Sequence, residues 1–272
     1  MKKFSIGFTN KIKEDYENDA VLDVCTKEVQ PKKSIVYVYF PHRVTGWAYY
    51  NDSFDLKVGD WVYVEGKLEG YRGRITEINY SFKIKASEYK RVIAVVDTTV
   101  NGDLYMAMSH LVSFDKNVIP YDKILSWFKA PENDDEYIYG DDNTDSFLLD
   151  DLSTMNIPSH IAERGHNYYT ENKVVYIELS DTYGRAIVEG SDNYEVLFNF
   201  TDGEISDIKC TCFCSGRCKH ELAAMLQLRE TLDFILKNYE AEYNGYFAAI
   251  SKEVLLGISM NKNGSGKISL EV

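Results

Sequence analysis

The first half of the chain alternates short apolar runs with turn-forming residues. The runs read SIVYVYF, GWAYY, DWVYVEG, YRGRITEINY and RVIAVVDTT, and they are rich in Val, Ile and Tyr. Such residues favour strands, and the Gly59-Asp60 and Gly66 positions between the runs favour turns. Because the strands are short and closely spaced, the pattern predicts a small β-barrel over residues 1–130. A short helix from Pro120 to Lys129, apolar on one face, is expected to close it.

A second set of alternating runs lies in the last third of the chain. VVYIELSD, GRAIVEGSD, YEVLFNFTDG and EISDIKC are separated by turn residues, which predicts an antiparallel meander. In CKHELAAMLQLRETLDFILKNY the apolar residues instead recur at helical spacing, so the meander should lead into a helix that buries this stripe. The last apolar segment, YFAAISKEVLLGI, is expected to form another helix packed on the first. We place this domain at residues 152–272.

Acidic residues separate the two halves. The segment PENDDEYIYGDDNTDSFLLDD, residues 131–151, has 9 acidic and no basic residues and lacks a periodic apolar face. This composition is typical of a solvated linker, and an alternative is an acidic tail or nucleic-acid mimic lying over a basic surface. Residues 1–130 carry 19 basic and 17 acidic residues, whereas 152–272 carry 11 and 17. The expected fold class is therefore α+β, with a small barrel joined by an acidic linker to a meander-plus-helix domain.

Four of the five cysteines lie within nine residues of one another. Cys210, Cys212, Cys214 and Cys218 are followed by His220, which gives the spacing CxCx5CxH. Cys210 and Cys212, two apart at the end of a strand, should face the same side, and Cys218 and His220 should approach from the first turn of the helix. Four such ligands suit tetrahedral zinc.

Two alternatives to zinc exist for this cluster. Free cysteines pack as small hydrophobic residues, but this set lies among Lys209, Arg217 and Lys219. A redox dithiol favours CxxC in a βαβ context, and here the spacing is CxC. Zinc is the preferred interpretation, and the clustered cysteines do not form the dispersed even set of a disulfide framework.

The cluster and the residues before it resemble the SWIM zinc finger. The family pattern is CxC, a variable loop and then CxH entering a helix, and RGHNYYTENKVVYIEL and GRAIVEGSDNYEVLF resemble the preceding family segments. The resemblance spans about residues 157–239 and implies that Cys210, Cys212, Cys218 and His220 bind one zinc ion. Cys214, in the variable loop, is a competing candidate ligand. A site with four protein ligands has no open position for water, so this zinc is expected to be structural.

Three catalytic motifs are excluded. HELAA begins like the HExxH motif of zinc proteases, but Ala224 replaces the second histidine. GSGKIS resembles a phosphate loop, but Asn261 replaces its first glycine and Ile268 its Ser or Thr. His160 and His166 have no partner with the signature of a nucleophile. The sequence therefore predicts a protein that is not an enzyme.

The predicted function is that of an adaptor. It is expected to bind nucleic acid, a protein partner or both, and among nucleic acids DNA is preferred to RNA. SWIM modules occur in bacterial Swi/Snf-type ATPases, Mutator-like transposases, recombination mediators and ubiquitin ligases, where they bind DNA or protein. In the barrel, DLKVGDWVYVEGKLEGYRGRITEI resembles SH3-like or KOW-type barrels. Between Lys67 and Arg91, basic and aromatic residues interleave as they do in nucleic-acid-binding surfaces, although a solvated strand face would have the same composition. The candidate contacts are Lys67, Tyr71, Arg72, Arg74, Tyr80, Lys83 and Lys85.

The alternative is a protein-only regulatory module whose acidic surface binds a basic partner. The expected partners are single-stranded or duplex DNA and a helicase or another protein. The start of the chain lacks the apolar core of a signal peptide, and no run reaches the roughly 18 apolar residues of a membrane span. A cytoplasmic protein without a membrane partner is therefore expected.

Overall fold

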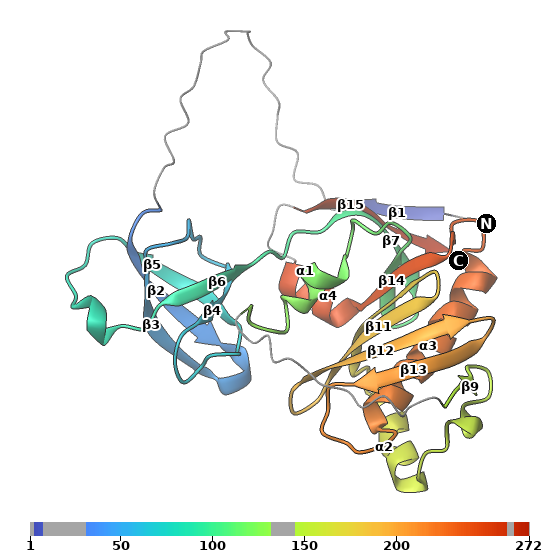
Figure 1. The fold of residues 1–272 in the computed structure, drawn as a ribbon. Coiled ribbons are helices and arrows are strands. Elements are labelled where there is room, and N and C mark those ends of the chain that lie inside the picture. The colour runs from blue at the N-terminus through green and yellow to red at the C-terminus, as the bar shows by residue number, and fades with distance from the viewer. Residues whose placement is uncertain (1–2, 8–30, 132–144, 260–263, 272) are drawn as a thin grey trace. The chain divides into compact units, whose positions relative to one another are not determined.

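The computed structural model describes residues 3–7, 31–131, 145–259 and 264–271, which form two compact units (Figure 1). Both helices and strands are present, so the chain is of mixed α+β class. Among the described residues, the larger unit holds 3–7, 99–125, 145–259 and 264–271, and the smaller unit holds 31–98 and 126–131. The division thus runs through the expected first domain, because residues 99–125 belong to the larger unit. No helix of the described ranges is long and apolar enough to cross a membrane.

The smaller unit is a five-stranded sheet with the strand order β3-β2-β5-β4-β6. Its strands coincide with the five apolar runs of the first half of the sequence. They are β2 Ser34–Phe40, β3 Thr45–Asn51, β4 Trp61–Val64, β5 Gly73–Asn79 and β6 Val92–Val96, with 3-10 turns at Pro41–Arg43 and Ala86–Glu88.

The expected barrel is not closed in the described residues. The edge strands β3 and β6 meet only near one isolated bridge, between Tyr50 and Arg91, where the Tyr50 N–H donates to the Lys90 carbonyl oxygen. A closed barrel requires a continuous ladder between its edge strands, and one bridge does not supply it. The inner face nevertheless holds a core of its own, because Val36, Val38 and other alternate residues are fully buried.

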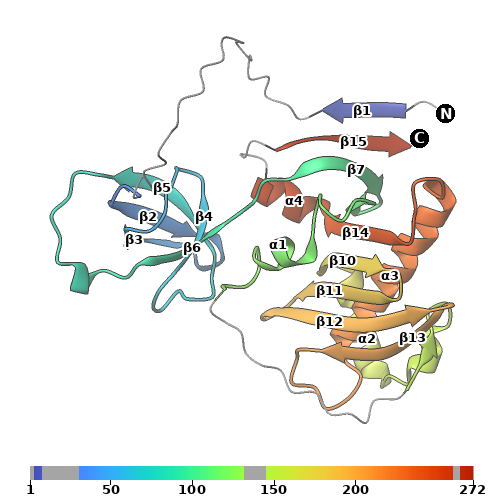
Figure 2. The ribbon, with the colours of Figure 1, turned by 45° about the horizontal axis from the view of Figure 1, so that its top comes forward.

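The larger unit is built on a ten-stranded sheet of order β1-β15-β7-β8-β14-β10-β11-β12-β13-β9 (Figure 2). The predicted meander is confirmed as four consecutive antiparallel strands, β10 to β13. The other strands come from distant parts of the chain. The bounds are β1 Lys3–Gly7, β7 Asn101–Ala107, β8 His110–Ser113, β9 Phe147–Leu148, β10 Val174–Ser180, β11 Tyr183–Glu189, β12 Asn193–Thr201, β13 Glu204–Cys210, β14 Tyr246–Ser251 and β15 Ser265–Glu271.

One long helix packs on the meander and carries the main core. The helices are α1 Tyr121–Leu125, α2 Ser159–Thr170, α3 Lys219–Asn238 and α4 Lys252–Ser259, with a 3-10 turn at Leu152–Met155. Most of the apolar stripe of α3 is buried as predicted, and Met225, Leu228 and Ile235 pack with the inward residues of β10 to β13, whereas Leu236 is exposed. The expected closing helix at 120–129 is shorter, since α1 ends at Leu125, and Trp127 beyond it donates its indole N–H to the Asp97 carbonyl oxygen.

Two other expectations need correction. The segment YFAAISKEVLLGI was expected to be one helix, but it begins as β14, a central strand buried at every position, and only then becomes α4. A strand buried on both faces has no polar alternation, so its sequence resembles that of a buried helix. In the expected acidic linker, residues 132–144 lie outside the described residues, whereas β9 at its end joins the sheet and buries Phe147.

Candidate metal centre

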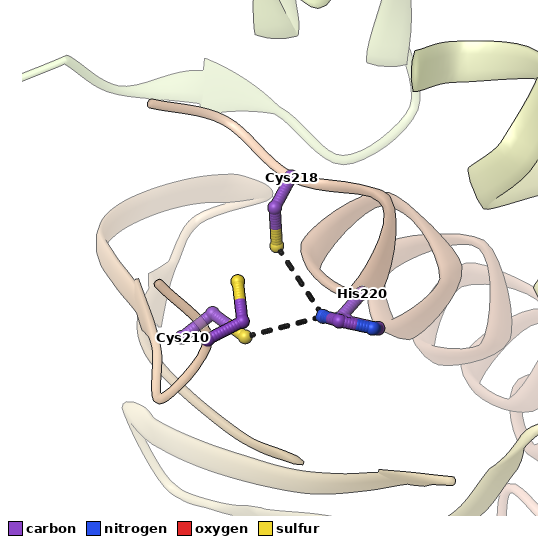
Figure 3. A group of neighbouring side chains, drawn as sticks. Cys210, Cys218 and His220 are labelled. Atoms are coloured by element: carbon purple, nitrogen blue, oxygen red, sulfur yellow. Dashed lines mark hydrogen bonds between the residues drawn. The ribbon is translucent and has the colours of Figure 1, made fainter. Parts of the chain in front are cut away.

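The four predicted ligands come together at the junction of β13 and α3. One ligand atom from each of Cys210, Cys212, Cys218 and His220 lies within 4.8 Å of all the others. The Nδ1 atom of His220 is 3.7 Å from the Cys210 sulfur and 3.9 Å from the Cys218 sulfur (Figure 3). Around a tetrahedral zinc ion, neighbouring sulfur and nitrogen ligands lie about 3.5 to 3.8 Å apart. The group therefore has the ligand types of a closed four-coordinate metal site, and its distances are close to those that such a site requires.

Regular secondary structure holds two of the ligands in place. Cys210 is the last residue of β13 and pairs with Val196 of β12. Cys218 is the N-cap residue of α3: its sulfur accepts from the Glu221 N–H at 3.4 Å, and its own N–H donates to the Glu221 carboxylate at 3.0 Å. This capping box fixes the first turn of α3 and the direction of His220. The positive end of the helix dipole also favours a negative charge on the Cys218 sulfur.

Backbone N–H groups point at the sulfur atoms of the cluster. The Cys212 N–H hydrogen-bonds to the Cys210 sulfur, and the Cys214 N–H to the Cys212 sulfur. Such bonds stabilise thiolates, which are the metal-binding form of cysteine. The arrangement therefore prepares all three ligand cysteines for a cation.

The thiols influence the pKa values of one another. A hydrogen bond from Cys210, together with those from His220 and the Glu221 N–H, lowers the pKa of Cys218 to about 4 despite its burial. The bond to Cys218 and burial raise the pKa of Cys210, and burial and the Cys218 charge raise that of Cys212 to about 12. Ionisation is thus favoured at Cys218 and disfavoured at Cys210 and Cys212, and a divalent cation would favour the thiolate form of all three.

Aromatic rings hold the histidine ligand. The His220 ring stacks on Tyr194 at 4.1 Å between centroids and meets the edge of Tyr168 at 5.4 Å. Its Nε2 atom is buried and has no hydrogen-bond partner among the described residues. Metal-binding histidines usually donate this second N–H to an acceptor, so here ring packing replaces the usual orienting hydrogen bond.

Two of the three basic residues beside the cluster serve the local fold. Arg217 donates to the Asp145 carbonyl oxygen at 3.0 Å and lies over the Phe147 ring. Lys219 places its ammonium group 4.4 Å from the centre of the Tyr168 ring.

Cys214 is exposed and lies outside the four-residue group. The next residue towards the N-terminus, Phe213, is fully exposed.

The seven predicted nucleic-acid contacts have different surroundings. Arg72 donates to the Trp127 carbonyl oxygen and lies over the rings of Trp61 and Phe128, so its guanidinium group supports the fold of the smaller unit. The other six are partly or fully exposed. Three of them take part in cation–π contacts: Arg74 with the Trp61 ring, Tyr71 with Arg43, and Tyr80 with Lys32. Lys85 forms an ion pair with Glu88. Lys67 and Lys83 are exposed.

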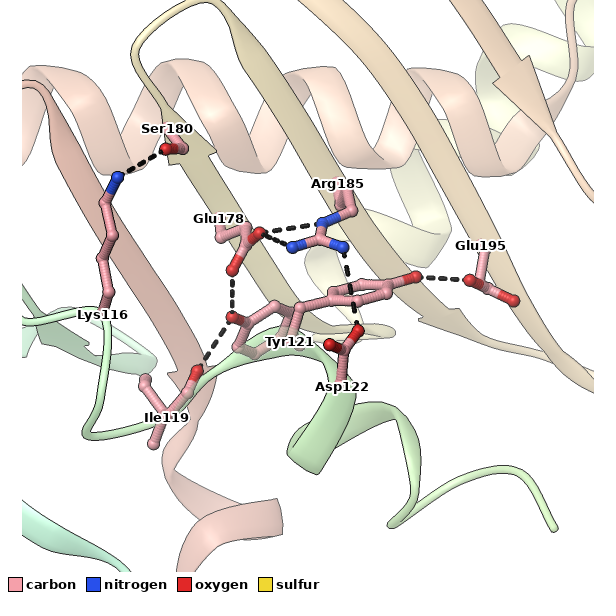
Figure 4. Close-up of polar contacts among 9 residues, drawn as sticks. Lys116, Ile119, Tyr121, Asp122, Glu178, Ser180, Arg185 and Glu195 are labelled. Atoms are coloured by element: carbon pink, nitrogen blue, oxygen red, sulfur yellow. Dashed lines mark hydrogen bonds and ion pairs between the residues drawn. The ribbon is translucent and has the colours of Figure 1, made fainter. Parts of the chain in front are cut away.

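The sequence did not reveal a polar cluster on the sheet face opposite α3 (Figure 4). Glu178, which is buried, accepts from Arg185 Nε at 2.8 Å and Nη2 at 2.5 Å, and from the Tyr176 hydroxyl at 2.7 Å. Arg185 lies 3.9 Å from the centre of the Tyr121 ring, whose hydroxyl donates to Glu195 at 2.5 Å. The charged groups are paired with each other, as in a structural ion pair. Its only sequence signals are a glutamate and an arginine within apolar strands.

A scan against protein-family models, a search of curated proteins and a search of solved structures each find no match for this chain. The indication of a metal centre therefore comes from the geometry of the four residues alone. That geometry supports the binding of one metal ion by the four ligands.

Proposed function

We propose that this chain is a SWIM-type adaptor in which one zinc ion has a structural role, and that it binds nucleic acid, DNA in preference to RNA, without catalysing a reaction. The closed Cys3His group carries the proposal. Three sulfur ligands and one imidazole select zinc over the hard cations Mg²⁺ and Ca²⁺, which prefer oxygen. When bound, the zinc would cross-link the end of β13 to the start of α3 through Cys210, Cys212, Cys218 and His220.

The distribution of charge supports a nucleic-acid role for the smaller unit. Over its described residues this unit carries 12 basic and 8 acidic side chains, a net charge of +4. The larger unit carries 13 and 23 over its described residues, a net charge of −10. Since neutralisation of phosphates supplies most non-specific affinity, the smaller unit is the one suited to contact nucleic acid.

The full-length chain with bound metal should be titrated into fluorescein-labelled oligonucleotides: single-stranded DNA, duplex DNA and single-stranded RNA, over a salt series. We expect binding at low salt, with a shallow salt dependence because few phosphates are neutralised. Absence of binding to all three oligonucleotides at low ionic strength would refute the nucleic-acid role.

A protein-only regulatory module is the second candidate. It is favoured by the net charge of −10 on the larger unit and by Phe213, whose fully exposed ring lies between a metal ligand and Cys214. Exposed aromatic side chains are common anchors of protein interfaces. A helicase or another protein with a basic surface would then be the partner.

A further inference from the structure

The outward face of the smaller unit's sheet carries two neighbouring tyrosines. Along β2, Tyr37 and Tyr39 alternate with the buried residues Val36, Val38 and Phe40, so the two rings share the face directed away from the core. Their exposed fractions are 44% and 38%. Single exposed aromatic residues are common, but here two aromatic residues at alternate positions of one strand are exposed on the same face.

Strand register extends this surface across the sheet. Tyr39 lies opposite Gly46 of β3 on one side and Arg74 of β5 on the other. Arg74 in turn lies opposite Trp61 of β4, and its guanidinium carbon is 5.9 Å from the centre of the Trp61 ring. Directly opposed residues share a face, so a basic side chain lies beside the tyrosines.

The orientation of Tyr37 is fixed by the adjacent strand. Its hydroxyl donates to the Gly46 carbonyl oxygen at 3.0 Å. A Cβ atom at position 46 would lie only 2.6 Å from Cε1 of Tyr37, so the ring lies against the glycine backbone. A ring held in this way loses little conformational entropy when a ligand binds.

We propose that Tyr37, Tyr39 and Arg74 form the surface on which single-stranded nucleic acid binds, with bases on the two rings and a phosphate on Arg74. The proposal rests on the proposed nucleic-acid function and names its site. Base stacking on tyrosine requires unpaired bases with a free face, which a duplex does not offer. The net charge of +4 on this unit complements phosphate, and Glu77, opposite Tyr37, is the one acidic residue in register with these tyrosines. Of the seven residues expected from the sequence, only Arg74 belongs to this surface.

The test measures fluorescence anisotropy of labelled oligo-dT with the full-length, metal-loaded chain at low salt. Tyr37→Ala and Tyr39→Ala should each weaken binding about 5- to 100-fold, since one base stack is lost. Tyr39→Leu keeps an apolar side chain without a flat ring and should weaken binding similarly. Arg74→Gln should weaken binding and reduce the salt slope by about one. Glu77→Gln should tighten it.

Trp47→Ala is the matched control. Trp47 is 60% exposed on the same sheet but pairs with Val38, which places it on the opposite face. We expect its removal to leave affinity unchanged, and circular dichroism should show that every variant is folded. If the wild-type chain binds oligo-dT and Tyr39→Leu binds equally well, the site is wrong while the function stands. Loss of binding in Trp47→Ala alone would also overturn the site. Equal affinity of the wild type for a matched duplex would overturn the preference for single strands. Absence of binding by the wild type would overturn the nucleic-acid function itself.

Discussion

Cys212 and Cys214 are separated by one residue, yet their side chains have different surroundings. The Cys212 sulfur lies in the four-residue metal group. Cys214 is exposed, and its backbone N–H donates a hydrogen bond to the Cys212 sulfur. The role of Cys214 in the site is therefore that of a hydrogen-bond donor through its main chain, which any residue other than proline can supply.

We predict that Cys214→Ser retains one zinc ion per chain and that Cys212→Ser loses it or binds it far more weakly. The serine variants differ only in which sulfur is removed, so each is the control for the other. Elemental analysis of the purified proteins, with a chromogenic zinc chelator to rank affinity, measures the difference. Loss of zinc from Cys214→Ser with retention in Cys212→Ser would reverse the ligand assignment.

His110, in β8, is a fully buried histidine away from the metal centre. Its Nε2–H donates to the Val174 carbonyl oxygen at 2.8 Å, and its Nδ1 accepts from the Ser109 hydroxyl at 2.9 Å. Both bonds suit the neutral ring. Burial lowers the pKa of His110 to about 4 from its usual 6.5.

The pKa of His110 predicts a pH dependence of stability. Between pH 6.5 and about 4 the unfolded chain binds a proton that the folded chain does not, so the free energy of unfolding falls as the pH falls through this window. The full effect is about 3 kcal/mol. Urea denaturation of wild type and His110→Gln at several pH values should show a flatter profile for the variant. His160→Gln, at an exposed position, should keep the wild-type slope, and equal slopes for all three would refute the prediction.

At the scale of elements, the contact between α2 and α3 depends on a glycine. A Cβ atom added at Gly165 of α2 would lie 2.9 Å from Cβ and Cδ2 of Leu222 in α3. Leu222 is two residues after the ligand His220, so the close approach supports the helix turn that carries the metal site. Close helix packing through a small residue explains why Gly165 lies within a helix despite its low propensity.

We predict that Gly165→Ala destabilises the chain by about 1 to 3 kcal/mol, because the overlap with Leu222 outweighs the gain in helix propensity. Gly257→Ala in α4 is the control, since a Cβ atom added there would have no other atom within 4 Å. There the same substitution should stabilise by about 0.5 to 1 kcal/mol. Thermal melts of both variants measure the difference, and stabilisation by Gly165→Ala would contradict the close packing.

The elements that sequence reasoning recovered are those with local signals. The meander β10 to β13 and the stripe of α3 follow from alternation and helical period. The CxCx5CxH spacing and the SWIM resemblance pointed to the four residues that the structure groups, and only the structure sets Cys214 outside that group. Long-range pairings have no such signal. β7 pairs in parallel with β15, so that Asn101 meets Ser265, and this pairing moves residues 99–125 into the larger unit. The tyrosine surface of the smaller unit likewise depends on which residues of β2, β3 and β5 lie opposite one another, and this register cannot be predicted from the local sequence pattern.

At the scale of the whole molecule, the two units have separate cores. The larger core joins α3 to the meander, and the smaller core lies on the inner face of its own sheet. Bound zinc would tie β13 to α3 and would therefore contribute to only one of these cores. All three tryptophans of the chain, Trp47, Trp61 and Trp127, belong to the smaller unit.

Because all the tryptophans lie in the smaller unit, tryptophan fluorescence reports the unfolding of that unit separately from the unfolding of the larger unit. We predict that a strong zinc chelator lowers the melting temperature of the larger unit, because a small zinc site contributes on the order of 10 kcal/mol to the folded state. Far-UV circular dichroism should show the loss, while the thermal transition followed by tryptophan fluorescence stays in place. Cys214→Ser, which keeps the proposed ligands, should respond to the chelator as the wild type does. If the chelator shifts the fluorescence transition together with the circular dichroism transition, the two units unfold as one. If the chelator shifts neither transition, the metal does not support the fold.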